Sequence, residues 1–356
     1  MDNIQLAIGY SNVLPGFYEN IWTPHKKNIH SIFFSAPKDF GVNNARGVYT
    51  TKDALQEINK MRTEKPELDM NLLLNCACIG NRLSQEDEFR VKCLLNRLYE
   101  MQCFTSISVS NAWYLRQVLK WKQEQRAEVD IHGSVIWDIK SIDEVENIFW
   151  RYGENCLQCI NISRKRVHDL EFLEKFKAHF PEIKIKLITN EWCMHNCPEQ
   201  TAHANYLSHW AEYNRLEKNF IGERLVTDGV QFCIYDVENF WRFLCGKGVP
   251  PDCLHYYNGL VDIWKIGSRS KDPVIMAELV EAYIHGKQKD LYFLFKTSHG
   301  GISLARQQDA KNAAKFKNIY LPEEWFKRRL KCEDNCYECK YCKHIFDDLL
   351  KNIRGS

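Results

Sequence analysis

Short apolar runs alternate with longer stretches of helical periodicity along most of this chain. Runs of apolar and β-branched residues predict eight strands. They cover residues 6–10, 31–35, 71–76, 105–109, 129–134, 156–162, 184–189 and 261–266. Helical spacing of apolar positions follows most of them, at residues 52–61, 88–101, 112–123, 142–150, 167–179, 201–214 and 273–285. This alternation is typical of repeated β-α units around a parallel sheet.

The number of strands favours an α/β fold of the closed (β/α)8 TIM type over an open doubly wound sheet. The glycine-rich first turn of a nucleotide-binding open sheet is not found in the sequence. We assign residues 1–290 to the barrel and residues 291–356 to a cysteine-rich extension that packs on it. Residues 14–28 and 222–252 exceed ordinary connections, so we expect insertions over the active face. Residues 289–301 are expected to add strand-like cover.

Charge and composition narrow the classes of partner. Lys and Arg total 48 against 46 Asp and Glu, which leaves a net charge of +2 and no electrostatic support for nucleic acid or a membrane surface. No stretch approaches the ~20 apolar residues that span a bilayer, and the amino terminus has no leader pattern. We therefore expect a cytoplasmic protein. In that reducing compartment, 15 cysteines at short spacings suggest a metal before a disulfide.

One pair of cysteines follows the seventh predicted strand, where a (β/α) barrel carries its chemistry. Cys193 and Cys197 form a C-x3-C loop that can place two thiolates on one cluster, and Pro198 then stops the loop. Two thiolates do not complete a site. Cys233 either reaches the same mouth or is buried as a small hydrophobic residue.

A second group of cysteines crowds the C-terminal extension, with four of them within eleven residues. This density predicts metal binding, with zinc as the first alternative and an iron-sulfur cluster as the second. The four are Cys332, Cys336, Cys339 and Cys342. Strand or helix placement favours ordinary core packing for the others, which are Cys76, Cys78, Cys93, Cys103, Cys156, Cys159, Cys245 and Cys253.

Polar residues at the carboxyl ends of the predicted strands should line one mouth of the barrel. Arg164, Lys265 and Arg269 can bind an anionic or carbonyl-bearing substrate, and Glu191 is a candidate acid or base. Pairing of these groups across the rim is the structural alternative. His195, between the loop cysteines, is expected to hydrogen-bond near the site rather than to bind the metal. The remaining members of this set are Ser11, Asn75, Asn111, Ser134 and Asn190.

Three segments resemble peptidase family U32, which includes collagenase-like barrel proteins with an iron-sulfur cluster. VDIWKIGSR at 261–269 is similar to the last strand of the family and its Lys-Ile-Glu-Gly-Arg signature, and CLQCINISRKR at 156–166 resembles the strand ending in Ser-Arg-Glu. ITNEWCMHNCPEQTAH at 188–203 resembles the cysteine loop of a sub-branch, whose Glu-Asp-x-Cys-x-x-Cys cluster is similar to residues 333–339. Here Gly267 and Lys165 stand where the family has its two carboxylates.

The resemblance implies a 4Fe-4S cluster, held by Cys193, Cys197, Cys233 and one C-terminal cysteine such as Cys339. Some members are called proteases, whereas others resemble oxygen-independent hydroxylases of RNA bases or quinone precursors. Because no Ser-His-Asp order, H-E-x-x-H motif or phosphate loop is visible, we favour redox modification of a small molecule or an RNA. A peptidase is one alternative. A non-enzymatic protein that binds a partner through a zinc or iron-sulfur module is the other.

Overall fold

The computed structural model describes eleven segments of the chain. They are residues 4–10, 16–37, 50–79, 85–193, 195–198, 200–202, 204–205, 208, 241–267, 272–297 and 314–354. Cys233, Arg269 and Ser11 lie outside these described residues. So does most of the helix predicted at 201–214, together with the larger part of the segment at 222–252.

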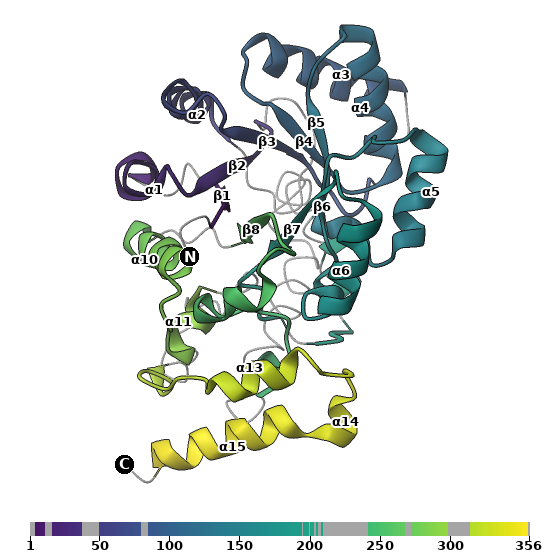
Figure 1. Cartoon of the computed structure of the whole chain (residues 1–356). Coiled ribbons are helices and arrows are strands. Elements are labelled where there is room, and N and C mark those ends of the chain that lie inside the picture. Colours follow the sequence, from purple (N-terminus) through teal and green to yellow (C-terminus); the bar gives the residue numbers. More distant parts are fainter. Residues whose placement is uncertain are drawn as a thin grey trace, which may run out of the picture.

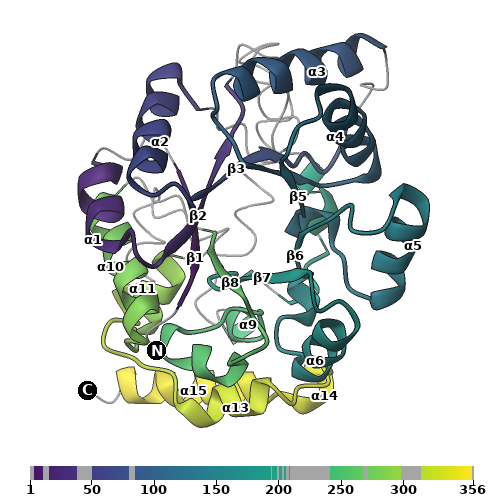
Figure 2. The same cartoon turned by 45° about the horizontal axis from the view of Figure 1, so that its top comes forward.

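Eight parallel strands close into one barrel in sequence order, with β1 paired to β8 (Figure 2). The strands are β1 (Leu6–Gly9), β2 (Ile29–Ser35), β3 (Asp69–Leu74), β4 (Ser106–Val109), β5 (Asp130–Gly133), β6 (Cys159–Asn161), β7 (Lys184–Ile188) and β8 (Ile263–Ile266). Each lies within or overlaps a run predicted from the sequence. The (β/α)8 fold class is therefore confirmed.

Helices surround the barrel, and local capping explains where several begin. The helices that follow strands of the barrel include α2 (Lys52–Glu64), α3 (Gln85–Glu100), α4 (Ala112–Gln125), α5 (Ile142–Tyr152), α6 (Leu170–His179) and α10 (Pro273–His285). Ser141 and Glu144 form a reciprocal capping box at the start of α5. Asp272 caps α10, whose first residue is Pro273. Both helices begin at the residues that the apolar periodicity predicted, 142 and 273.

The segment between β1 and β2 was predicted to be an insertion over the active face, and the structure differs from that prediction. It forms the π-helix η1 (Tyr18–Trp22) and the short α1 (Thr23–His25), and η1 packs against α2 and α10. Trp22 is fully buried, and its Nε1 donates to Glu64 of α2 at 3.1 Å. Figure 1 shows α1 beside α10 in the outer layer. The segment thus takes the first helical place of the ring because its aromatic residues have apolar neighbours there.

The C-terminal extension is helical and lies along one side of the barrel (Figure 1). Residues expected to add strand-like cover form α11 (Leu291–Lys296) instead, capped by Asp290. After residue 313 come α13 (Glu323–Arg329), α14 (Cys336–Cys339) and α15 (Tyr341–Arg354). Helix α15 packs on α9 (Trp241–Leu244). Trp325 of α13 stacks on Trp192 after β7, with ring centroids 6.1 Å apart.

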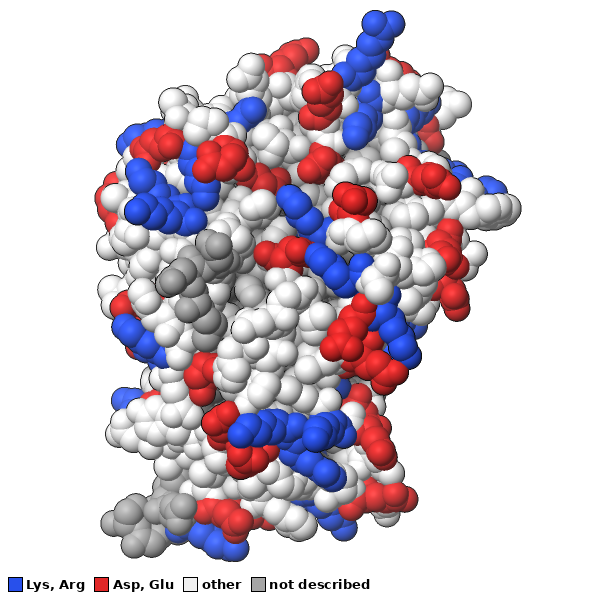
Figure 3. All heavy atoms as spheres, in the orientation of Figure 1, with Lys and Arg blue, Asp and Glu red and all other residues white. Residues whose placement is uncertain are grey.

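The surface carries both charges without a dominant sign. Figure 3 shows Lys and Arg interspersed with Asp and Glu over most of one face. This pattern agrees with the net charge of +2. Within the described residues, no helix is long and apolar enough to cross a membrane.

Candidate functional site

Two glycines let the loop after β7 lie directly against residues 245–248. A Cβ on Gly246 would stand 2.6 Å from the carbonyl oxygen of Cys193, and a Cβ on Gly248 would stand 2.4 Å from the indole of Trp192. Either contact is closer than real Cβ atoms approach their neighbours. The sequence Cys-Gly-Lys-Gly therefore brings Cys245 and Lys247 next to the Cys193 loop.

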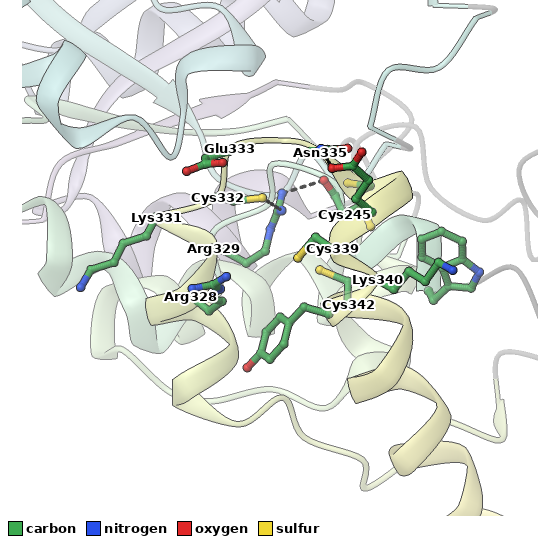
Figure 4. Close-up of a pocket in the computed structure, with 14 residues that line it drawn as sticks. Cys245, Arg328, Arg329, Lys331, Cys332, Glu333, Asn335, Cys339, Lys340 and Cys342 are labelled. Atoms are coloured by element: carbon green, nitrogen blue, oxygen red, sulfur yellow. Dashed lines mark hydrogen bonds between the residues drawn. The ribbon is translucent and has the colours of Figure 1, made fainter.

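Arg329, at the end of α13, joins the extension to this segment. Its side chain is 1% exposed, and Nη2 donates to the carbonyl oxygens of Cys245 at 2.7 Å and Gly246 at 3.1 Å. Its Nη1 donates to Sγ of Cys332 at 2.9 Å. Figure 4 shows the guanidinium reaching Cys332 and the segment of Cys245. One buried cation thus contacts both cysteine-bearing segments.

Five cysteines gather around one cavity of about 370 Å³ beside this arginine (Figure 4). They are Cys245, Cys332, Cys336, Cys339 and Cys342. Four of them form the group predicted from the C-terminal spacing. Cys245 was assigned to core packing, and it is buried, but its thiol also hydrogen-bonds with those of Cys336 and Cys342. Its position 87 or more residues before the others hid this contact, although the flanking glycines are a signal of close approach.

The thiols of this cavity differ in acidity. The hydrogen bond from Cys245, together with the charge of Arg329, lowers the pKa of Cys336 to about 6 against the effect of burial. A second hydrogen bond of Cys245, with Cys342, lowers the pKa of Cys342 to about 7. Cys245 is the donor, so its own pKa is raised. Thiolates at neutral pH are the form that binds zinc and iron.

The described residues include thiols that can bind a metal, but these thiols do not surround one common point. No three His, Cys, Asp or Glu side chains among the described residues converge on a common metal position. The donor set around the cavity, with its acidic thiols and a nearby guanidinium, still fits a thiophilic metal or cluster. Rotation of cysteine side chains would be needed to close such a site.

Alkylation tests the acidity of Cys336 directly. In chelator-treated protein, we expect iodoacetamide labelling of Cys336 to rise with pH around a midpoint near 6, well below the ~8.5 of an ordinary thiol. The variant Cys245→Ala removes the largest cause of that shift, so its midpoint should rise by about one pH unit or more. Peptide mass spectrometry reads both values. Cys103→Ala, which is remote from the cavity, is the control, and an equal shift there would contradict the assignment.

The mouth of the barrel holds a small hollow of about 20 Å³ after β6 and β7. Arg164, Glu191, Cys193 and His195 are among the residues that line it. Nη1 of Arg164 lies 3.4 Å from Oε1 of Glu191, and the Glu191 side chain is buried. The expected substrate-binding arginine and the expected acid or base therefore meet, and they form an ion pair with each other. Because the Glu191 side chain is buried, this ion pair at the rim of the barrel is shielded from solvent.

Lys265 and Cys339 do not line this hollow. Lys265 is buried on β8, and its Nζ lies 4.3 Å from the ring centroid of Phe33. Cys339 lines the cysteine cavity, and Cys193 lines the hollow. Cys197 is half-buried in the same loop as Cys193. The structure thus places the predicted ligands in two neighbouring groups, and Cys233 and Arg269 fall outside the described residues.

Asp334 joins these two groups. It lies between Cys332 and Cys336, and its carboxylate oxygens are 2.8 and 2.9 Å from Nζ of Lys247. Nε2 of His195 lies 3.8 Å from Oδ1 of Asp334. Burial lowers the pKa of His195, which Asp334 opposes, so the imidazole is neutral at pH 7. The Cys193 loop and the C-terminal cysteine loop therefore meet at one carboxylate, and Nε2 of His195 is buried there without a hydrogen-bond partner among the described residues.

Comparison with known proteins gives one relative at low identity. An uncharacterized protease of Methanocaldococcus jannaschii is 22% identical over 333 residues, which is 92% of this chain and 90% of the relative. No family model matches the chain.

Solved structures give weaker likenesses. The U32 peptidase Mk0906 has a TM-score of 0.47 at 12% identity, over 63% of this chain and 85% of that protein. The carboxyl transferase domain of Rhizobium etli pyruvate carboxylase has a TM-score of 0.40 at 10% identity, over 87% of this chain and 53% of that protein. The similarity to the archaeal protease along nearly the whole length of both chains supports the resemblance of this chain to peptidase family U32.

Proposed function

We propose that this chain is a U32-type enzyme that holds an iron-sulfur cluster in its cysteine cavity and modifies a substrate at the adjoining mouth of the barrel. The observation that carries the proposal is the group of five cysteines around one cavity, drawn from two distant segments. Four thiolates complete a [4Fe-4S] cluster, so the cavity has enough donors. A bound cluster would supply one-electron redox chemistry.

The ligands that we favour are Cys245, Cys336 and Cys342, because the thiol of Cys245 hydrogen-bonds with those of Cys336 and Cys342. Cys339 or Cys332 would provide the fourth. Arg329 offsets the negative charge of the thiolates and hydrogen-bonds to Cys332, and such hydrogen bonds to sulfur tune the potential of a cluster. The set of Cys193, Cys197, Cys233 and a C-terminal cysteine is the competing assignment.

Substrate binding would use the ion pair at the hollow. A carboxylate or phosphate group on the substrate can replace Glu191 as the partner of Arg164. Glu191, released from that pair, would be the acid or base candidate beside the substrate. Neutral His195 and the ammonium of Lys247 lie beside this position and can orient polar groups of the substrate. We propose redox modification, such as oxygen-independent hydroxylation, of a small molecule or an RNA base.

Metal analysis of anaerobically purified protein tests the proposal. We expect iron and acid-labile sulfide in near-equal amounts and a brown colour. The variants Cys245→Ala and Cys336→Ala should lose iron, and Cys253→Ala should keep it because Cys253 is buried away from the cavity. If Cys193→Ala loses iron and Cys245→Ala keeps it, the cluster would be assigned to the mouth of the barrel instead of the cysteine cavity. Stoichiometric zinc without iron would overturn the proposal and favour a zinc module that binds a partner.

A peptidase is the second candidate, because the relative from Methanocaldococcus jannaschii is named a protease. Cys193, His195 and Glu191 around one hollow are residue types that peptidases use. Casein cleavage by metal-free protein that persists in Cys336→Ala and disappears in Cys193→Ala would support this candidate. Absence of cleavage by iron-loaded and metal-free protein alike would remove it.

A further inference from the structure

A second cavity lies at the opposite end of the barrel from the Cys193 hollow. Its volume is about 410 Å³, and its lining includes the first residues of β3, β5, β7 and β8, which are Asp69, Asp130, Lys184 and Ile263. His132, two residues after Asp130 on β5, also lines it. Residues two apart on a strand face the same side, so these side chains point into the barrel. The cavity therefore opens at the amino ends of the strands and reaches the interior.

Carboxylates dominate the lining of this cavity. Glu67, Asp69, Asp130 and Glu182 line it, together with the ammonium of Lys184. The two histidines of the lining add no charge at pH 7, because burial lowers the pKa of His30 to about 4 and that of His132 to about 3. The lining therefore disfavours an anionic ligand and favours a cationic one.

One of these carboxylates has an acceptor that the protein leaves open. Oδ1 of Asp69 accepts hydrogen bonds from Thr105 and Ser106. Oδ2 is buried and has no hydrogen-bond partner of normal geometry among the described residues. Oγ of Ser31, which stands opposite Asp69 on β2 and near its carboxylate, is buried and also lacks such a partner. Buried acceptors are normally satisfied in proteins, so these two oxygens point to a bound donor.

The protein itself supplies only part of the positive charge that this end of the barrel needs. Burial opposes ionisation of Asp69, yet neighbouring His132 and Lys186 and the hydrogen bond from Ser106 lower its pKa. Lys186 is 2% exposed on β7, and it forms no ion pair with Asp69, although both lie in the described part of the chain. Lys184 and Lys186 balance two of the four carboxylates, so the remaining negative charge suits a dication.

The negative charges occupy two levels of the cavity. Asp69 faces the interior, whereas Glu67 and Glu182 are exposed on the connections that lead into β3 and β7. The lining also includes the buried apolar side chains of Leu68 and Ile263. A molecule with a positive group at each end of an apolar chain matches this order. A metal ion does not, because no three His, Cys, Asp or Glu side chains among the described residues converge on one point.

We infer that this amino-terminal cavity binds a short aliphatic diamine. One ammonium lies against the carboxylate of Asp69 inside the barrel, and the other lies among Glu67, Asp130 and Glu182 at the rim. The methylene chain lies along Ile263. The site is independent of the cysteine cavity and of the chemistry proposed there.

Calorimetric titration and thermal shift test the inference on the whole protein. The probes are putrescine and cadaverine as diamines, butylamine with one ammonium, butanediol with none, and magnesium and zinc ions. We expect at least one diamine to bind and raise Tm, and butylamine and butanediol to bind at least ~10-fold more weakly. Equal binding of butylamine would overturn the diamine assignment. Displacement of the diamine by stoichiometric magnesium or zinc would overturn it in favour of a metal site.

Variants locate the diamine within the cavity. Asp69→Asn should weaken it by ~10-fold or more, because it removes the charge from the acceptor inside the barrel. Asp130→Asn and Glu182→Gln should each weaken it by about 3-fold, because solvent screens the exposed rim. Glu128→Gln is the matched control, since Glu128 is exposed beside the start of β5 but does not line the cavity. An equal loss in Glu128→Gln would show non-specific attraction and overturn the site.

Nuclear magnetic resonance of the unsubstituted protein covers the case in which Asp69→Asn does not fold. The methylene protons of the bound diamine should give nuclear Overhauser effects to the methyl groups of Ile263, which line the cavity. Effects to other methyl groups without any to Ile263 would place the diamine elsewhere and overturn the site. So would the absence of any change in Tm at about 50 mM of either diamine.

Discussion

Replacement of Arg329 by methionine is expected to lower the free energy of unfolding by about 3–5 kcal/mol. The guanidinium is buried and donates to the carbonyl oxygens of Cys245 and Gly246 and to Sγ of Cys332. Methionine keeps the apolar stem and removes all three donors, so two backbone carbonyls lose their partners in a dry environment. Chemical denaturation followed by tryptophan fluorescence measures the loss.

Arg328→Met is the matched control for this experiment, because Arg328 is the preceding residue of α13 and is exposed. Its effect should stay within about 0.5 kcal/mol, as for most surface substitutions. Arg329→Met should also raise the pH midpoint for alkylation of Cys336, since the charge of Arg329 lowers the pKa of that thiol. Equal stability of the two variants would show that α13 is held by its aromatic contacts alone.

Gly248→Ala is expected to cost about 3 kcal/mol of stability through overpacking. The new Cβ would stand 2.4 Å from two ring carbons of Trp192. Trp192 is fully buried and stacks on Trp325, which is buried as well, so the indole has little room to yield. Thermal unfolding and near-UV circular dichroism of the tryptophans report the loss and the displaced ring.

Gly259→Ala separates crowding from backbone strain. Gly259 has φ +81 and nothing within 4 Å of an added Cβ, so its substitution costs only the left-handed strain of about 1–2 kcal/mol. The double variant Trp192→Phe with Gly248→Ala should be less destabilised than the sum of the single variants, because a smaller ring leaves space for the methyl group. Additive losses would contradict the proposed contact.

Local patterns account for the parts of the fold that were predicted correctly. Each strand of the barrel was marked by an apolar run, because a parallel sheet covered by helices is buried on its outer face. Apolar periodicity placed the starts of α5 and α10 at residues 142 and 273, where Ser141 and Asp272 cap them in the structure. A helix cap or a strand period involves residues a few positions apart, so the sequence contains the whole interaction.

The candidate site was only half predictable for the same reason. The C-terminal cysteines are close in sequence, and their spacing indicated a metal site. Cys245 joins them only because Gly246, Gly248 and Arg329 bring two distant segments together. Pairing of Arg164 with Glu191 was foreseen as an alternative, but the choice depends on the distance between two strand ends.

Periodicity and cysteine spacing were sufficient to derive the barrel, most of its helices and a thiol-rich extension, because those features arise from interactions between near neighbours. Only the tertiary structure placed η1 in the helical ring, made 291–296 a helix, and set Cys245, Arg329 and Asp334 side by side. Each of these depends on which surfaces meet after the barrel closes. The burial that decides them belongs to the whole chain and has no local signature.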